Sequence, residues 1–125
     1  MRSYSIVIAS LAIQAPEKWT DNLISQHGLP GVVSANRGTA RRIPHHALVR
    51  LALVRQLHAR LGLGVADGLR MAGQLLDSEN DAYESGQLRV SFDRAALEGA
   101  LHTRLGEVLE SVPTRRRGRP PSSKT

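Results

Sequence analysis

The last residues of the chain hold a dense set of cationic side chains. The segment "RRRGRPP" spans residues 115–121 and contains Arg115, Arg116, Arg117, Gly118, Arg119 and Pro120. The minor groove of A·T base pairs is narrow and carries a strong negative potential that attracts arginine. Glycine lets the backbone lie close to the groove floor, and proline holds the next residues extended. These residue types are therefore suited to contact with a polyanion such as DNA, and a solvated, charged chain end is the alternative.

A second cationic region lies in the first half of the chain. No aspartate or glutamate occurs between Asp21 and Asp67, whereas this interval contains Arg37, Arg41, Arg42, Arg50, Arg55 and Arg60. Acidic residues gather instead in "DSENDAYE", at residues 77–84. Of the net charge of +6, the segment 113–125 contributes +5. A basic first half and a basic tail predict a polyanionic partner, most simply nucleic acid, and a solvated surface is the alternative.

Other kinds of chemistry lack their residues. The chain has no cysteine, which excludes disulfides and cysteine-liganded zinc. Its five histidines have no acidic partners at metal-ligand spacing, and "GLGVADG" lacks the lysine of a phosphate-binding loop. No nucleophile–base pattern occurs, and no apolar run approaches the roughly 18 residues of a membrane helix. We therefore expect no enzymatic activity, no metal, no cofactor and no membrane partner.

The elements that would position the cationic residues are mostly helical. With 125 residues and 41% apolar content, the chain is expected to form one domain with a small appendage. Residues 5–27 predict two short helices joined by a tight turn near residues 13–15, with Pro16 in the first turn of the second helix and Gly28 after its end. Residues 29–44 predict a small β-hairpin with its tip at residues 36–39. The start, "MRSYSIVIASLAIQA", also has features of a short signal peptide, which is the alternative to a first helix.

The second half of the chain has the clearest periodicity. Apolar residues at helical spacing predict a helix that starts at Pro44, breaks at "GLG" (residues 62–64) and is followed by a shorter helix to residue 76. The acidic segment 77–86 is expected to be a loop, and "QLRVSF" alternates like a half-buried strand. Asp93 is expected to cap a last helix, whose apolar stripe is Leu97, Leu101, Leu105, Val108 and Leu109. The composition after Val112 predicts a disordered tail.

The order of these elements resembles the DNA-binding domain of the MerR superfamily of bacterial transcription regulators. The resemblance covers about residues 4–76. There "SIVIASLAIQAPEKWTDNLISQHGLPG" resembles the helix-turn-helix, and "RRIPHHALVRLALVRQLHARLGLGVADGLRMA" resembles the end of the wing and the helix pair after it. Arg42, Ile43 and Leu48 stand at the arginine, aromatic and leucine positions of the family, with Ile43 replacing the aromatic residue. The family's long coiled-coil helix and effector domain have no counterpart here.

The resemblance implies how the chain would hold DNA. The second helix, residues 16–26, would enter the major groove, and its candidate reading residues are Lys18, Thr20, Asn22 and Gln26, beside Asp21. Arg37 at the wing tip would reach the minor groove or a phosphate, and Arg41 and Arg42 would contact the DNA backbone. The core of the tail, residues 117–120, resembles an AT-hook, with Arg115, Arg116 and Lys124 on phosphates.

The sequence thus predicts a mainly α protein in four parts. These are a winged helix-turn-helix with a small β-hairpin wing at 1–76, an acidic linker loop at 77–86, a strand-helix dimerisation unit at 87–112 and a disordered basic tail at 113–125. The predicted function is sequence-specific binding of double-stranded DNA by a small bacterial transcriptional regulator, most simply a repressor. It would act as a homodimer in the cytoplasm, on the nucleoid.

Three alternatives to a regulator are open. A nucleoid-associated or recombination accessory protein would use the same residues to bind many DNA sites with weak preference. An antitoxin would regulate its own gene through the winged domain and hold a protein partner with the segment 77–111. A protein-interaction module would use the helices at 47–76 and 94–111, and its tail would only add solubility.

Overall fold

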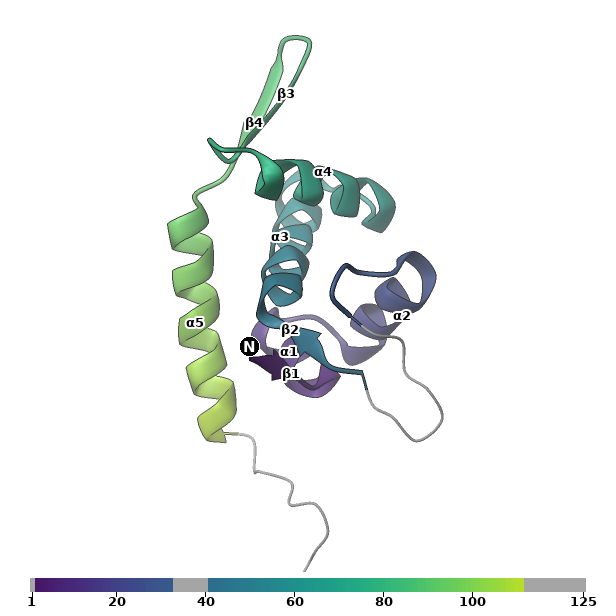
Figure 1. Ribbon diagram of the computed structural model, residues 1–125, viewed down its shortest axis with the longest axis vertical. Coiled ribbons are helices and arrows are strands. Elements are labelled where there is room, and N and C mark those ends of the chain that lie inside the picture. Colours follow the sequence, from purple (N-terminus) through teal and green to yellow (C-terminus); the bar gives the residue numbers. More distant parts are fainter. Residues whose placement is uncertain (1, 33–40, 112–125) are drawn as a thin grey trace, which may run out of the picture.

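Two short helices open the described part of the chain. The computed structural model describes residues 2–32 and 41–111 (Figure 1). Helix α1 spans Ile6–Ala12, and the Ser5 hydroxyl caps it by accepting a hydrogen bond from the Ile8 N–H at 3.3 Å. Helix α2 spans Glu17–His27 and ends at Gly28, whose φ of 75° glycine adopts without strain. The predicted pair of helices, the turn between them and the glycine after them are confirmed.

The strand that precedes α1 pairs across a long sequence separation. Strand β1 (Ser3–Tyr4) is antiparallel to β2 (Ile43–Pro44), with Tyr4 opposite Ile43. The expectation from sequence is that residues 41–43 return along residues 32–33 as a hairpin. Within the described residues, however, the strand at 43–44 pairs with the start of the chain. The expected wing tip at residues 36–39 lies outside the described residues, so the structure leaves the wing as a prediction.

Helix α3 (His45–Leu61) is the central element of the core. Its buried residues are Ala47, Leu48, Val49, Leu51, Ala52, Leu53, Val54 and Leu57. A helix that is apolar on most sides lies in the interior of a domain. Gly62 ends α3 in the left-handed conformation with a φ of 71°, and α4 (Val65–Asp77) then packs against α3. Both helices and the break at 62–64 agree with the sequence prediction.

A β-hairpin projects from the body beyond α4 (Figure 1). Strands β3 (Ala82–Ser85) and β4 (Leu88–Ser91) are antiparallel, and Gly86, with a φ of 60°, allows the tight turn between them. Two expectations are wrong here. The segment 77–86 is not only a loop, because it contains β3. The strand after it is not half-buried along its length, because Leu88 lies near the hairpin tip and is 75% exposed.

Helix α5 (Arg94–Ser111) returns along the body. As predicted, Asp93 caps it, accepting a hydrogen bond from the Ala96 N–H at 3.0 Å. Leu101 and Leu105 are buried where α5 packs against α1 and α3. The apolar stripe expected to form a dimer surface is therefore used at its centre within the same chain, and only its end at Leu109 is exposed. The described part is mainly helical with two small antiparallel sheets, which confirms the mainly α prediction.

Candidate nucleic-acid interface

The connection between α1 and α2 is a tight turn at residues 13–16 that is braced from outside. Gln14 has a φ of 59°, a left-handed conformation that is costly for a residue with a Cβ. Arg55 of α3 donates a hydrogen bond to the Gln14 carbonyl at 3.0 Å. Arg104 of α5 donates from Nε to the Ala12 carbonyl at 2.6 Å. Two helices distant in sequence therefore fix the geometry of this turn.

A buried pair of hydroxyl groups joins the two helices. Ser10 of α1 donates to Thr20 of α2 with an Oγ–Oγ1 distance of 2.9 Å, and the Thr20 hydroxyl donates to the Pro16 carbonyl at 3.4 Å. Ser10 is 3% exposed and Thr20 is 0% exposed. The expectation that Thr20 reads DNA is therefore wrong, because its side chain has no access to a groove. The inner face of α2 is centred on Thr20, Leu23 and Ile24.

The opposite face of α2 is polar and exposed. Lys18, Asn22 and Gln26 are four residues apart and form one exposed row along the helix. The row is about 12 Å long, from a rise of about 1.5 Å per residue, which matches roughly three to four base pairs of DNA. Amide side chains form bidentate hydrogen bonds with adenine, and lysine bonds to guanine or to phosphate. The structure thus brings three of the four predicted reading residues of α2 together.

Arg41 binds Asp21 and Ser25 of α2, which lie next to the exposed row on the same helix. Its guanidinium donates to the Asp21 carboxylate at 3.0 Å, the Asp21 carbonyl at 3.2 Å and the Ser25 hydroxyl at 2.9 Å, and its side chain is 15% exposed. Arg41 therefore holds α2 in place, and its expected contact with the DNA backbone stays a prediction. Arg42 is exposed and donates to the Ser3 carbonyl at 3.1 Å, so it braces β1 while staying at the surface.

Arg55 is a positioning residue that the sequence pattern does not reveal. Besides its bond to Gln14, its guanidinium carbon lies 4.7 Å from the centre of the Trp19 ring, in a cation–π contact. Arg55 thereby links the turn, α2 and α3. The one sequence signal is that Arg55 directly follows the apolar run "LALV" at residues 51–54. Arg55 lies in the interval between Asp21 and Asp67, which has no acidic residue and which predicted a polyanionic partner. Its contacts nevertheless stabilise the fold.

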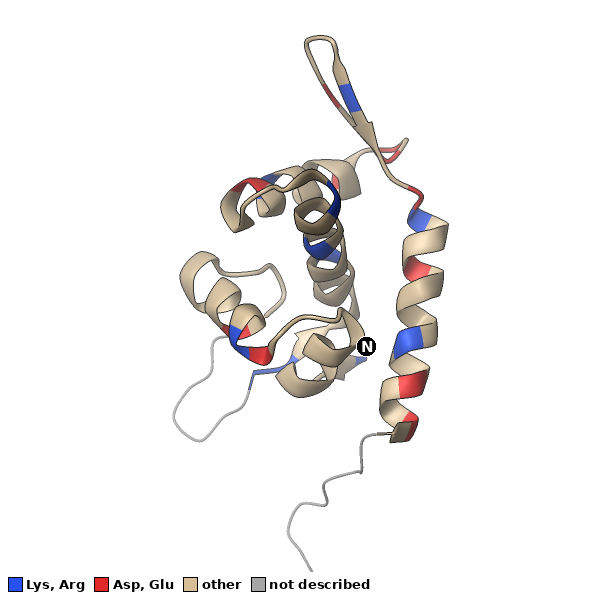
Figure 2. Cartoon of the chain, turned by 180° about the vertical axis from the view of Figure 1, so that it is seen from behind, with Lys and Arg blue, Asp and Glu red and all other residues tan. Residues whose placement is uncertain are grey.

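Basic and acidic residues balance over the described part of the chain. The ranges 2–32 and 41–111 contain eleven of each, and Figure 2 shows both signs interspersed along α5. Four ion pairs lie among the described residues: Arg41–Asp21, Arg70–Asp67, Arg89–Glu84 and Arg94–Asp81. The six excess positive charges therefore belong to the segments 33–40 and 112–125. Any strong attraction to a polyanion must come from these two segments.

Several predicted DNA-binding residues lie outside the described ranges: Arg37, Arg115, Arg116, Arg117, Gly118, Arg119 and Pro120. Within those ranges, no group of three or more histidine and acidic side chains is arranged to hold a metal ion. No described helix combines the length and the apolar character needed to cross a membrane. The apolar N-terminal stretch forms α1, whose residues Ala9 and Ala12 are buried in the core.

Comparison with known proteins gives no match to this chain among protein-family models, curated proteins or solved structures. The functional argument therefore depends on the geometry of the α1–α2 pair and on the distribution of charge.

Proposed function

We propose that the chain is a sequence-specific double-stranded DNA-binding protein, a small transcriptional regulator in which α1 and α2 form a helix-turn-helix. The observation that carries this proposal is the exposed row Lys18–Asn22–Gln26 on a helix whose inner face is fixed. A recognition helix must present its reading side chains from a rigid position in the major groove. The Ser10–Thr20 hydrogen bond and the contacts of Arg41 supply that rigidity for α2.

The charge distribution supports a division of labour between parts of the chain. The exposed face of α2 carries Glu17, Lys18 and Asp21, so it attracts DNA weakly by charge. The wing segment with Arg37 and the tail at 113–125, whose core at 117–120 resembles an AT-hook, hold the excess positive charge. We assign affinity to these segments through phosphate and minor-groove contacts, and base reading to α2.

A homodimer is part of the proposal because one row on α2 spans only about three to four base pairs. Two copies related by a two-fold axis would read two half-sites and so define a longer sequence. The centre of the α5 stripe is buried within the chain, so it is not free for this contact. Among the described residues, the exposed large apolar side chains are Val7 and Leu11 of α1, Leu61 of α3, Leu88 of β4 and Leu109 of α5.

The test is selection of duplexes from a random library by the full chain, followed by fluorescence anisotropy with the enriched and a scrambled duplex. We expect an enriched motif. In the double variant Asn22→Ala/Gln26→Ala, the preference for that motif should fall at least about tenfold, since each bidentate base contact contributes about 1–3 kcal/mol. Gln74→Ala is the matched control, because Gln74 is an exposed helical amide on α4. It should leave the preference unchanged.

The alternatives give different results in the same assay. Binding of every duplex with similar affinity would favour a nucleoid-associated or recombination accessory protein. Absence of binding near physiological salt would refute DNA binding and favour a protein-interaction module. A version ending at Val112 tests the tail: an affinity loss confined to AT-rich duplexes supports the AT-hook, and an equal loss on all duplexes shows a purely electrostatic role.

A further inference from the structure

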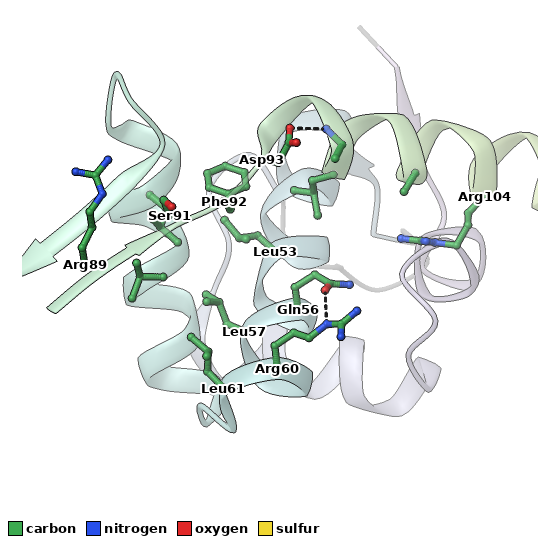
Figure 3. Close-up of a pocket in the computed structure, with 15 residues that line it drawn as sticks. Leu53, Gln56, Leu57, Arg60, Leu61, Arg89, Ser91, Phe92, Asp93 and Arg104 are labelled. Atoms are coloured by element: carbon green, nitrogen blue, oxygen red, sulfur yellow. Dashed lines mark hydrogen bonds between the residues drawn. The ribbon is translucent and has the colours of Figure 1, made fainter.

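A pocket lies between α3, α4, β4 and α5 (Figure 3). Its volume is about 660 Å³, within the range of roughly 300–1,000 Å³ that is typical of small-molecule sites. Leu53, Leu57 and Leu75 line it and are buried residues of the core. Phe92 and Leu97 add apolar surface from the segment that leads into α5. The pocket is therefore mainly apolar, and α3, α4, β4 and α5 line it.

Three of the six polar residues that line the pocket are arginines, and one of them, Arg89, is paired with Glu84. Arg60 and Arg104 lie on the same side of it in the view of Figure 3. Among the described residues, neither arginine is within salt-bridge distance of a carboxylate. The pocket's acid, Asp93, caps α5 and lies eleven residues from Arg104, which is roughly 16 Å along a helix. One side of the pocket thus presents two guanidinium groups without acidic partners beside apolar walls.

We propose that this pocket binds a small amphipathic anion, an alkyl or aryl carboxylate. Its apolar part would cover Leu53, Leu57 and Phe92, and its carboxylate would meet Arg60 and Arg104. Guanidinium groups bind carboxylates through paired, charge-assisted hydrogen bonds, and apolar walls favour a hydrophobic chain. A small molecule is favoured over a protein segment because a stable protein interface needs at least about 1,000 Å² of buried surface. A volume of about 660 Å³ fits a single ligand.

The pocket is connected to the turn of the α1–α2 pair. Arg104 lines the pocket and also donates to the carbonyl of Ala12, the last residue of α1. A carboxylate that binds Arg104 side-on, through Nε and one terminal nitrogen, takes the Nε–H that donates to Ala12, so occupancy alters the brace on the turn. The ligand would thereby regulate the presentation of α2, and this regulatory step rests on the proposed function. Trp19, which stacks on the other brace, Arg55, reports on the turn.

The experiment is isothermal titration calorimetry of the full chain with decanoate and with decan-1-ol. We expect decanoate to bind one to one and more tightly than the alcohol. Arg60→Gln should weaken decanoate binding about tenfold or more and leave the alcohol unchanged. Arg70→Gln is the matched control, because Arg70 is an exposed arginine of α4 outside the pocket. Ala100→Trp fills the pocket from the exposed side of α5 and should abolish binding of both probes.

Contrary results would overturn the proposal without any use of DNA. Equal binding of decanoate and decan-1-ol, or no effect of Arg60→Gln, would exclude an anion site. Absence of binding, together with a dimer in light scattering that Ala100→Trp dissociates, would make the groove an interface between copies. Decanoate should also shift the emission of Trp19, the one tryptophan of the chain, in the wild type, and much less in Arg60→Gln at the same concentration. Binding without that shift would refute the connection to the turn.

Discussion

Replacing Thr20 with valine isolates the hydrogen bond that joins α1 to α2. Valine has nearly the shape of threonine but lacks the hydroxyl, so the Ser10 Oγ–H loses its acceptor at a site that is 3% exposed. An unsatisfied buried polar group costs about 1–3 kcal/mol. A helical serine can turn its hydroxyl to a carbonyl one turn back. The expected loss of unfolding free energy is therefore in the lower part of that range, about 1–2 kcal/mol.

A double-mutant cycle separates this bond from other effects of the substitution. Ser10→Ala leaves the Thr20 hydroxyl bonded to the Pro16 carbonyl, so it should cost only about 0.5–1 kcal/mol. The double variant Ser10→Ala/Thr20→Val removes both polar groups and leaves neither unsatisfied. It should be more stable than the sum of the single losses by about 1 kcal/mol. Urea unfolding of the full chain, followed by circular dichroism and by Trp19 fluorescence, measures all four free energies.

Two results would refute the reasoning. If the single losses add within about 0.3 kcal/mol, Ser10 and Thr20 do not interact in the folded protein. If Thr20→Val weakens DNA binding while the free energy of unfolding stays the same, Thr20 faces the DNA and the assigned inner face of α2 is wrong.

Three further substitutions test other contacts, each by urea unfolding. Gly31→Ala should cost about 2 kcal/mol or more, because Gly31 has a φ of 89° and an added Cβ would collide with the His46 imidazole. Arg55→Met should cost about 1–2 kcal/mol, because it removes the cation–π contact and the hydrogen bond to the turn. Leu101→Ala should cost about 2–5 kcal/mol at every protein concentration, because Leu101 is fully buried within one chain.

Matched controls accompany these variants. Gly28→Ala adds a Cβ at a similar φ of 75° but into open space, so it should cost less than Gly31→Ala. Arg60→Met on the same helix as Arg55, and Leu109→Ala at the exposed end of α5, should each change stability by less than about 0.5 kcal/mol. If the loss of unfolding free energy in Leu101→Ala disappears when the protein concentration is raised, Leu101 does not pack within one chain. The apolar stripe of α5 would then be a dimer surface, as the sequence predicted.

Local rules predicted the helices because they depend on neighbours in the chain. Apolar spacing near 3.6 residues and the glycines after helix ends located α2, α3 and α4, with Gly28 and Gly62 as observed. The strands were less predictable. β1 pairs with β2 across 39 residues, and no local pattern encodes such a partner. β3 lies in an acidic segment that reads as a loop, and its pairing with β4 makes it a strand.

The features of the candidate site also divide into those that the sequence determined and those that only the tertiary structure decided. The sequence alone determined where the excess positive charge lies and that Lys18, Asn22 and Gln26 share one helical row, since both follow from residue order and helix period. Only the tertiary structure decided that Thr20 points inward, because adjacent helix positions differ by about 100° and the packing of α1 selects the inner face. Only the tertiary structure also decided which arginines are internal braces. Arg41, Arg55 and Arg104 donate hydrogen bonds to partners 20, 41 and 92 residues away. Whether a guanidinium has such a partner depends on distances in space, which the order of residues in the sequence does not contain.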